Sequence, residues 1–69
     1  MSESFVIANG EKRSTSLPCS VEDFLAGQGL LPRSVVVELN GEALAPSEFA
    51  AKLLKQGDRM EIVRVVAGG

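Results

Sequence analysis

Short stretches rich in hydrophobic residues lie at both ends of the chain, and part of the segment between them has the hydrophobic spacing of a helix. Residues 4–8, SFVIA, are rich in β-branched and aromatic side chains, and Asn9-Gly10 follows them directly. Asn-Gly provides two residues that tolerate positive φ, which a tight type I′ turn requires. Together with the polar stretch EKRSTSL over residues 11–17, this pattern predicts a β-hairpin.

The next segment has the spacing of a short helix. Ser20 followed by Asp23 resembles the start of a capping box, and Gly29 suits the left-handed position after a helix, where Leu30 can pack back onto the last turn. We therefore expect a helix of about two turns, as its apolar spacing indicates. The candidates for its buried face stand at i, i+3, i+4 and i+7: Val21, Phe24, Leu25 and Gln28.

A second extended stretch, SVVVELNGEAL, follows Pro32 and covers residues 34–44, with Asn40-Gly41 as a turn into a short strand. Because side chains alternate between the two faces of a strand, one set should point to the core and the other away from it. The first set is Val35, Val37 and Leu39, and the second is Val36 and Glu38.

The last part of the chain predicts a helical segment and a strand. Pro46 suits a first helical turn, and residues 47–54 would form one or two turns that offer Phe49 and Leu53 to the core. KQGD at residues 55–58 turns the chain into a last strand, RMEIVRVV, over residues 59–66. In that strand Met60 and Ile62 share one face, and the other face holds Glu61, Val63 and Val65.

This order of elements indicates an α+β fold. One main helix plus a short helical turn, packed on a mixed sheet of four or five strands, would bury the apolar faces together. For the last strand to lie centrally, it would run beside the first strand and parallel to it, which is the β-grasp or ubiquitin-like arrangement. We expect a single domain over residues 1–69 with a flexible Gly-Gly tail at about 67–69.

Composition narrows the possible functions. The chain has one cysteine and no histidine, so no intramolecular disulfide and no zinc-ligand spacing is expected, and we expect no bound metal. Seven basic residues are scattered among nine acidic ones, which argues against a nucleic-acid partner. The first ten residues lack a positively charged leader, and no apolar run is long enough to span a membrane. A cytoplasmic protein is the simplest expectation.

The second half of the chain resembles a known family. The NGE turn at residues 40–42, the Pro46 to Phe49 segment, the GD turn, the EIV strand and the terminal VAGG keep their order and spacing over residues 37–69. In these features the chain is similar to the ThiS family, the sulfur carriers of thiamine biosynthesis. The hairpin and helix of the first half fit the same fold but are less distinctive.

The resemblance implies a protein co-substrate and not an enzyme, with no bound cofactor. An ATP-dependent adenylyltransferase of the ThiF type would adenylate Gly69, and sulfur from a cysteine persulfide enzyme would convert it to a thiocarboxylate. A thiazole synthase of the ThiG type would then take up that sulfur. Gly68 lacks a side chain and would let the chain end thread into a narrow channel.

Other interpretations of the same residues remain open at this stage. The terminal glycines could be a frayed end, and Cys19 could be a sulfur-relay thiol, although nothing near it in the sequence suggests a relay partner. Val36, Val63 and Val65 are either ordinary strand residues or a partner-binding face. Several glutamates are better explained as solvated surface than as general acids or bases: Glu22, Glu38, Glu42, Glu48 and Glu61.

Three alternative functions share the same fold. The small subunit of molybdopterin synthase (the MoaD family) also ends in Gly-Gly, but it tends to be longer and to have a proline before the glycines. A ubiquitin-like modifier would join its terminus to lysines of other proteins, and a plain binding module would not use the tail. The mass of the protein after incubation with activating enzyme, ATP and a sulfur source separates a carrier from a modifier and from a binding module.

Overall fold

The first hairpin forms as the sequence predicts. The computed structural model describes residues 4–65, in which β1 (Phe5–Ala8) pairs antiparallel with β2 (Glu11–Ser14). Ala8 lies opposite Glu11, so only two residues form the loop, and both have positive φ, 53° at Asn9 and 79° at Gly10. The polar strand is shorter than the stretch 11–17 considered from the sequence.

The helix α1 (Val21–Gly27) also begins where it was predicted. The Ser20 hydroxyl accepts a hydrogen bond from the Asp23 amide at 3.0 Å, and Gly29 has a φ of 75°. The Leu30 amide donates to the Leu25 carbonyl at 2.9 Å, which closes the C-terminal turn. Gln28 was wrongly included in the buried face: it is the C-cap residue and is exposed, because the helix ends just before it.

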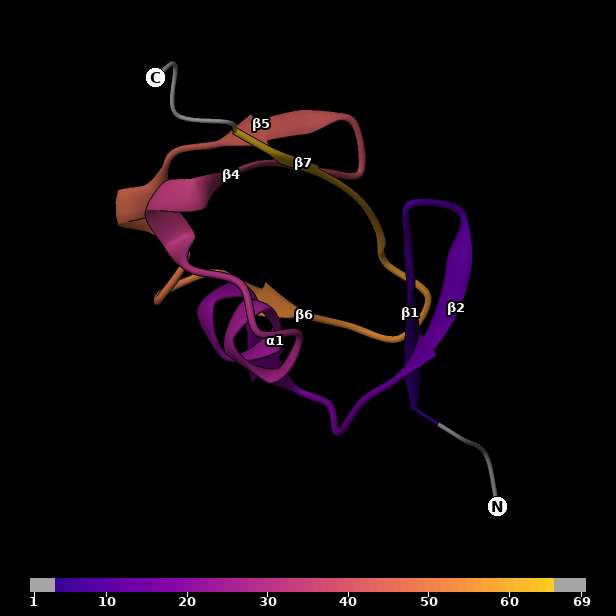
Figure 1. Cartoon of the computed structure of the whole chain (residues 1–69). Coiled ribbons are helices and arrows are strands. Elements are labelled where there is room, and N and C mark those ends of the chain that lie inside the picture. The colour runs from indigo at the N-terminus through magenta and orange to yellow at the C-terminus, as the bar shows by residue number, and fades with distance from the viewer. Residues whose placement is uncertain (1–3, 66–69) are drawn as a thin grey trace.

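Five strands form one mixed sheet in the order β2-β1-β7-β4-β5. The short 3-10 helix η1 (Pro32–Ser34) leads into β4 (Val35–Leu39), which forms a hairpin with β5 (Glu42–Leu44). The last strand, β7 (Arg59–Arg64), lies in the centre, parallel to β1 and antiparallel to β4. Figure 1 shows this sheet curving over α1. The predicted α+β class and the β-grasp topology are confirmed.

The segment after Pro46 differs from the sequence-based expectation. Only η2 (Pro46–Glu48) is helical, and it is a single 3-10 turn. The carbonyls of Phe49 and Lys52 accept hydrogen bonds from the first two amides of α1, Glu22 at 3.1 Å and Val21 at 2.9 Å. The first backbone amides of any helix have no hydrogen-bond partner within the helix. These two carbonyls supply partners for two such amides of α1.

The following residues form a second, two-stranded sheet that the sequence did not predict. β6 (Leu53–Leu54) pairs antiparallel with β3 (Cys19–Ser20), and Figure 1 places β6 close to α1. In an extended segment neighbouring side chains point to opposite sides. Leu53 is therefore 54% exposed, whereas Leu54 is fully buried. The prediction that Leu53 lies in the core was wrong. It assumed a helix in which Leu53, four residues after Phe49, would share its face.

The hydrophobic core lies between the sheet and α1. Both predicted strand faces are confirmed, with Met60 buried on β7 and Glu61 and Val63 exposed on its other face. No helix within residues 4–65 is long and apolar enough to cross a membrane. The buried apolar residues come from β1, α1, β4, β6, β7 and the segment after η2: Val6, Ala8, Val21, Phe24, Leu25, Val35, Val37, Leu39, Phe49, Leu54 and Met60.

Candidate functional site

The central strand β7 is the last element before the predicted tail. It ends at Arg64, and Val65 extends it by donating its amide to the Ser34 carbonyl at 2.8 Å. Gly68 and Gly69, the residues predicted to carry the chemistry, lie outside the described residues. The geometry available for the site is therefore that of β7, of its neighbouring strands, and of the sheet face directed away from α1.

Three valines at the end of β7 and the start of β4 form an exposed apolar surface, the valine patch. Val36 is 52% exposed, Val63 61% and Val65 51%. Val36 and Val63 lie directly opposite each other in the β4–β7 pairing. The three side chains are exposed, as the partner-binding interpretation requires, and the patch adjoins the point where the chain continues toward its terminus. Grouped exposed apolar side chains of this kind are typical of protein interaction surfaces.

Next to the valine patch, two glutamates stand side by side. Glu38 and Glu61 are paired across β4 and β7, two positions along from Val36 and Val63, and both are exposed on the same face. Like charges directly opposite each other disfavour strand pairing. Neither carboxylate forms an ion pair with another described residue. The outer face of the sheet thus combines an apolar patch with adjacent negative charge.

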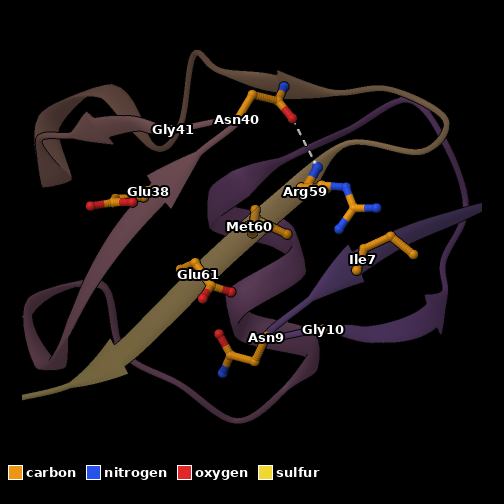
Figure 2. Close-up of a pocket in the computed structure, with 9 residues that line it drawn as sticks. All are labelled: Ile7, Asn9, Gly10, Glu38, Asn40, Gly41, Arg59, Met60 and Glu61. Carbon is orange, nitrogen blue, oxygen red and sulfur yellow. Dashed lines mark hydrogen bonds between the residues drawn. The ribbon is translucent and has the colours of Figure 1, made fainter.

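A shallow hollow of about 700 Å³ extends this face toward β1. Figure 2 shows the Arg59 side chain directed toward Ile7 and away from Glu38. Within the described part of the chain, Arg59 forms no salt bridge. The hollow is lined by the two Asn-Gly turns and by residues of three strands: Ile7, Asn9, Gly10, Glu38, Asn40, Gly41, Arg59, Met60 and Glu61.

The side chain of Asn9 binds the backbone of β7. Its Oδ1 accepts from the Ile62 amide at 2.7 Å, and its Nδ2 donates to the Ile62 carbonyl at 3.1 Å. The backbone amide of Asn9 also donates to the Met60 carbonyl at 2.9 Å. The amide group of Asn9 therefore continues the β1–β7 pairing after the backbone of β1 has turned away into the hairpin loop.

Asn40, in the other turn, contacts the start of β7 in a partly similar way. Its Oδ1 accepts from the Arg59 amide at 3.0 Å, as Figure 2 shows, and its Nδ2 donates to Asp58 Oδ1 at 3.2 Å. The sequence predicts both asparagines only as turn residues. The available signal was the choice of Asn at a position where Gly or Asp also fits, since of these three residues only Asn has a side chain that can both donate and accept hydrogen bonds at neutral pH.

The remaining candidates show no arrangement for chemistry. Cys19 is half-buried in β3, and its Sγ lies 3.8 Å from Thr15 Oγ1. Glu48 is exposed, and its carboxylate accepts from the Ala45 amide at 2.7 Å, which supports η2. Glu22 and Glu42 are exposed. Among residues 4–65, no three histidine, cysteine, aspartate or glutamate side chains are grouped to hold a metal ion.

Comparison with protein families gives a match that covers nearly the whole chain. The model of the ThiS family matches residues 6–69, which include both terminal glycines. Two curated proteins named thiazole synthase are also similar, one from Paramagnetospirillum magneticum with 38% identity over 64 residues and one from Magnetococcus marinus with 31% over 61 residues. These matches include 93% and 88% of this chain but only 20% and 19% of the relatives. The chain thus spans about a fifth of their length.

Solved structures show the same fold. The crystal structure of a thiamine biosynthesis protein (ThiS) from Geobacter metallireducens superposes with a TM-score of 0.80 at 29% identity, covering 94% of this chain and 99% of that one. The solution structure of a thiamine biosynthesis protein from the same organism gives a TM-score of 0.77, also at 29% identity, over 94% and 87% of the two chains. Similarity at this level extends over the complete β-grasp domain.

Proposed function

The chain belongs to the ThiS family, and from this premise we propose that it carries sulfur as a thiocarboxylate on Gly69 for thiazole formation in thiamine biosynthesis. The observation that carries the proposal is the extent of the family match, which continues through the terminal glycines to residue 69. In this role the protein is a co-substrate of other enzymes and not a catalyst. The cytoplasmic location expected from the sequence stays a prediction.

The chemistry of a terminal carboxylate explains why activating enzymes are needed. An α-carboxyl group has a reference pKa of about 3.3–3.7, so it is ionised at neutral pH and resists nucleophilic attack. Adenylation by a ThiF-type enzyme joins the carboxylate to AMP and releases pyrophosphate, which removes the charge and creates a leaving group. The terminal sulfur of a persulfide then attacks the acyl carbon, AMP leaves, and a thiol cleaves the S–S bond to release the thiocarboxylate.

Thiazole synthase is the proposed acceptor of the sulfur. A segment similar to this chain forms about a fifth of two proteins named thiazole synthase. A carrier and its acceptor that occur within one polypeptide meet at a high effective concentration. We propose that the present chain binds the same kind of acceptor through the valine patch. The activating enzyme would bind through the same patch.

Deletion of Gly69 tests the proposal. The deletion moves the carboxylate back by about 3.3–3.6 Å in an extended chain. Reacting atoms must approach to about 3–3.5 Å, so the truncated protein should support no ATP–pyrophosphate exchange with its ThiF-type enzyme. The full chain should support exchange and, with a persulfide donor, gain the mass of one sulfur in place of one oxygen. Undiminished exchange by the truncated chain would refute the proposal.

The same mass measurement separates a sulfur carrier from a protein modifier and from a binding module. A protein modifier would appear in covalent adducts with other proteins, and a binding module would keep its mass. A molybdopterin-synthase subunit would be charged with sulfur in the same way. It differs at the next step, because its thiocarboxylate would not be consumed by thiazole synthase supplied with its other substrates. Loss of the added sulfur in that reaction therefore supports the thiamine pathway.

A further inference from the structure

We propose that Asn9 is a positioning residue for the reactive terminus: its amide sets the course of the end of β7, from which the chain continues to Gly69. The inference rests on the proposed function, since it assigns a residue to the presentation of the tail. The strand β7 is held differently along its two sides, by β4 on one side and by β1 with Asn9 on the other.

The side of β7 that faces β4 is held by backbone along its whole length. Their pairing begins at Leu39 and Met60 and continues to Val35 and Arg64, and the amide of Val65 then binds the carbonyl of Ser34. In this antiparallel ladder Val65 is a hydrogen-bonded position. Bonded positions recur at every second residue, so the odd-numbered residues of β7 direct their backbone groups to β4 and the even-numbered ones face β1.

The side that faces β1 is held over a much shorter length. Only Ile7–Arg59 and Ala8–Met60 are paired, because β1 turns into its hairpin at Asn9. Ile62 is the next residue whose backbone faces β1, and both of its polar groups are bound by the Asn9 amide at 2.7 and 3.1 Å. Among the described residues, Asn9 is thus the last group on the β1 side to hold β7 before the tail.

Loss of this amide would leave the end of β7 attached to β4 alone. A strand held along one edge can twist about that edge, and a rotation there changes the direction in which the chain leaves the sheet after Val65. Positioning errors of about 1 Å can reduce the rate of an enzyme reaction about 100-fold. Val63 stays paired with Val36 on β4, so docking through the valine patch should change less than the reaction does.

Asn40 provides a matched control. It occupies the same position of the same kind of turn, with a φ of 51° against 53° for Asn9. Its Oδ1 likewise binds a backbone amide of β7, that of Arg59. Arg59 is the first residue of the strand, three residues further from the terminus than Ile62. Glycine adopts positive φ without strain, so replacing either asparagine by glycine removes the amide contacts and keeps the turn.

The experiment compares Asn9→Gly and Asn40→Gly in ATP–pyrophosphate exchange with the ThiF-type enzyme, well below the Tm of each variant. We expect Asn9→Gly to lower kcat about ten-fold or more with KM for the carrier changed less than about two-fold, because transition-state positioning and not docking is lost. Asn40→Gly should keep kcat within about two-fold of wild type. Equal kcat values for the two variants, or a change in KM alone for Asn9→Gly, would overturn the assignment.

Amide hydrogen exchange gives a readout that is independent of activity. The Ile62 amide should exchange faster in Asn9→Gly, and the Arg59 amide faster in Asn40→Gly. Unchanged protection of Ile62 in Asn9→Gly would also overturn the inference, because the amide contact would then not hold the strand. Pyrophosphate exchange by the wild-type chain tests the proposed function separately from the role of Asn9. If it supports no exchange of pyrophosphate, the proposed function fails, and the protection of Ile62 still reports on Asn9.

Discussion

Replacing Val63 by Asp should weaken partner binding without unfolding the domain. Val63 is 61% exposed at the centre of the valine patch, opposite Val36. Burying a whole valine side chain is worth about 1.5–3 kcal/mol, so a partner that covers the exposed part of Val63 gains about 1–2 kcal/mol. Losing that contribution weakens binding about 5- to 30-fold. An unpaired carboxylate in the interface adds a further desolvation cost.

The cost to stability should be small. Strand propensities span about 1 kcal/mol, and loss of the Val36 cross-strand contact adds about 0.2–1 kcal/mol. For a domain of this size, about 1 kcal/mol lowers Tm by about 4–8 °C. The Val63→Asp protein should therefore melt cooperatively at a moderately lower temperature. Val63→Thr keeps the β-branched shape and serves as a second variant that tests the apolar contact with less perturbation of the strand.

The assay is titration calorimetry with the ThiF-type enzyme and separately with thiazole synthase. Leu53→Asp is the matched control, since Leu53 is 54% exposed but lies on β6, outside the five-stranded sheet. The control should bind both partners as wild type does. If Val63→Asp also binds both partners with wild-type affinity, the valine patch is not the docking surface. If it weakens binding no more than Leu53→Asp does, the effect is not specific to the patch.

Three further predictions concern other parts of the chain. Gly68→Val should leave Tm nearly unchanged, since terminal residues usually contribute little packing, and should strongly reduce pyrophosphate exchange because a branched side chain obstructs threading. Cys19→Ser should leave thiocarboxylate formation, measured by mass, within a few-fold of wild type; a collapse of sulfur loading with the fold intact would instead establish a relay thiol. Leu54→Ala should lower the free energy of unfolding by about 2–5 kcal/mol in denaturant unfolding. Leu53→Ala should change it by less than about 0.5 kcal/mol. Equal effects would contradict the burial of Leu54 and the exposure of Leu53.

The turns, the helix and the strand faces could be predicted from the sequence because each depends on residues close together in the chain. Asn9-Gly10 and Asn40-Gly41 adopt positive φ wherever the neighbouring strands lie. Ser20 caps a helix three residues away, and strand alternation alone separates Val63 from Met60. The terminal glycines, too, are a feature of the sequence alone, and together with the second half of the chain they indicated the family.

Tertiary structure decided the features that depend on distant residues. Local spacing allowed residues 47–54 to be helical. Instead, the carbonyls of Phe49 and Lys52 accept hydrogen bonds from the N-terminus of α1, and Leu53–Leu54 pairs with β3. Likewise, only the β4–β7 register places Glu38 opposite Glu61.

The support of β7 by the two turns is likewise a product of the assembled fold. Asn9 and Ile62 are 53 positions apart in sequence, and nothing in the local pattern of either predicts that one binds the other. Secondary-structure propensity and the spacing of apolar residues depend on a few neighbouring positions. The partner of a side-chain amide is determined only when the sheet has formed. The sequence therefore determined which residues could turn, cap and alternate, and the packed sheet determined what their polar groups bind.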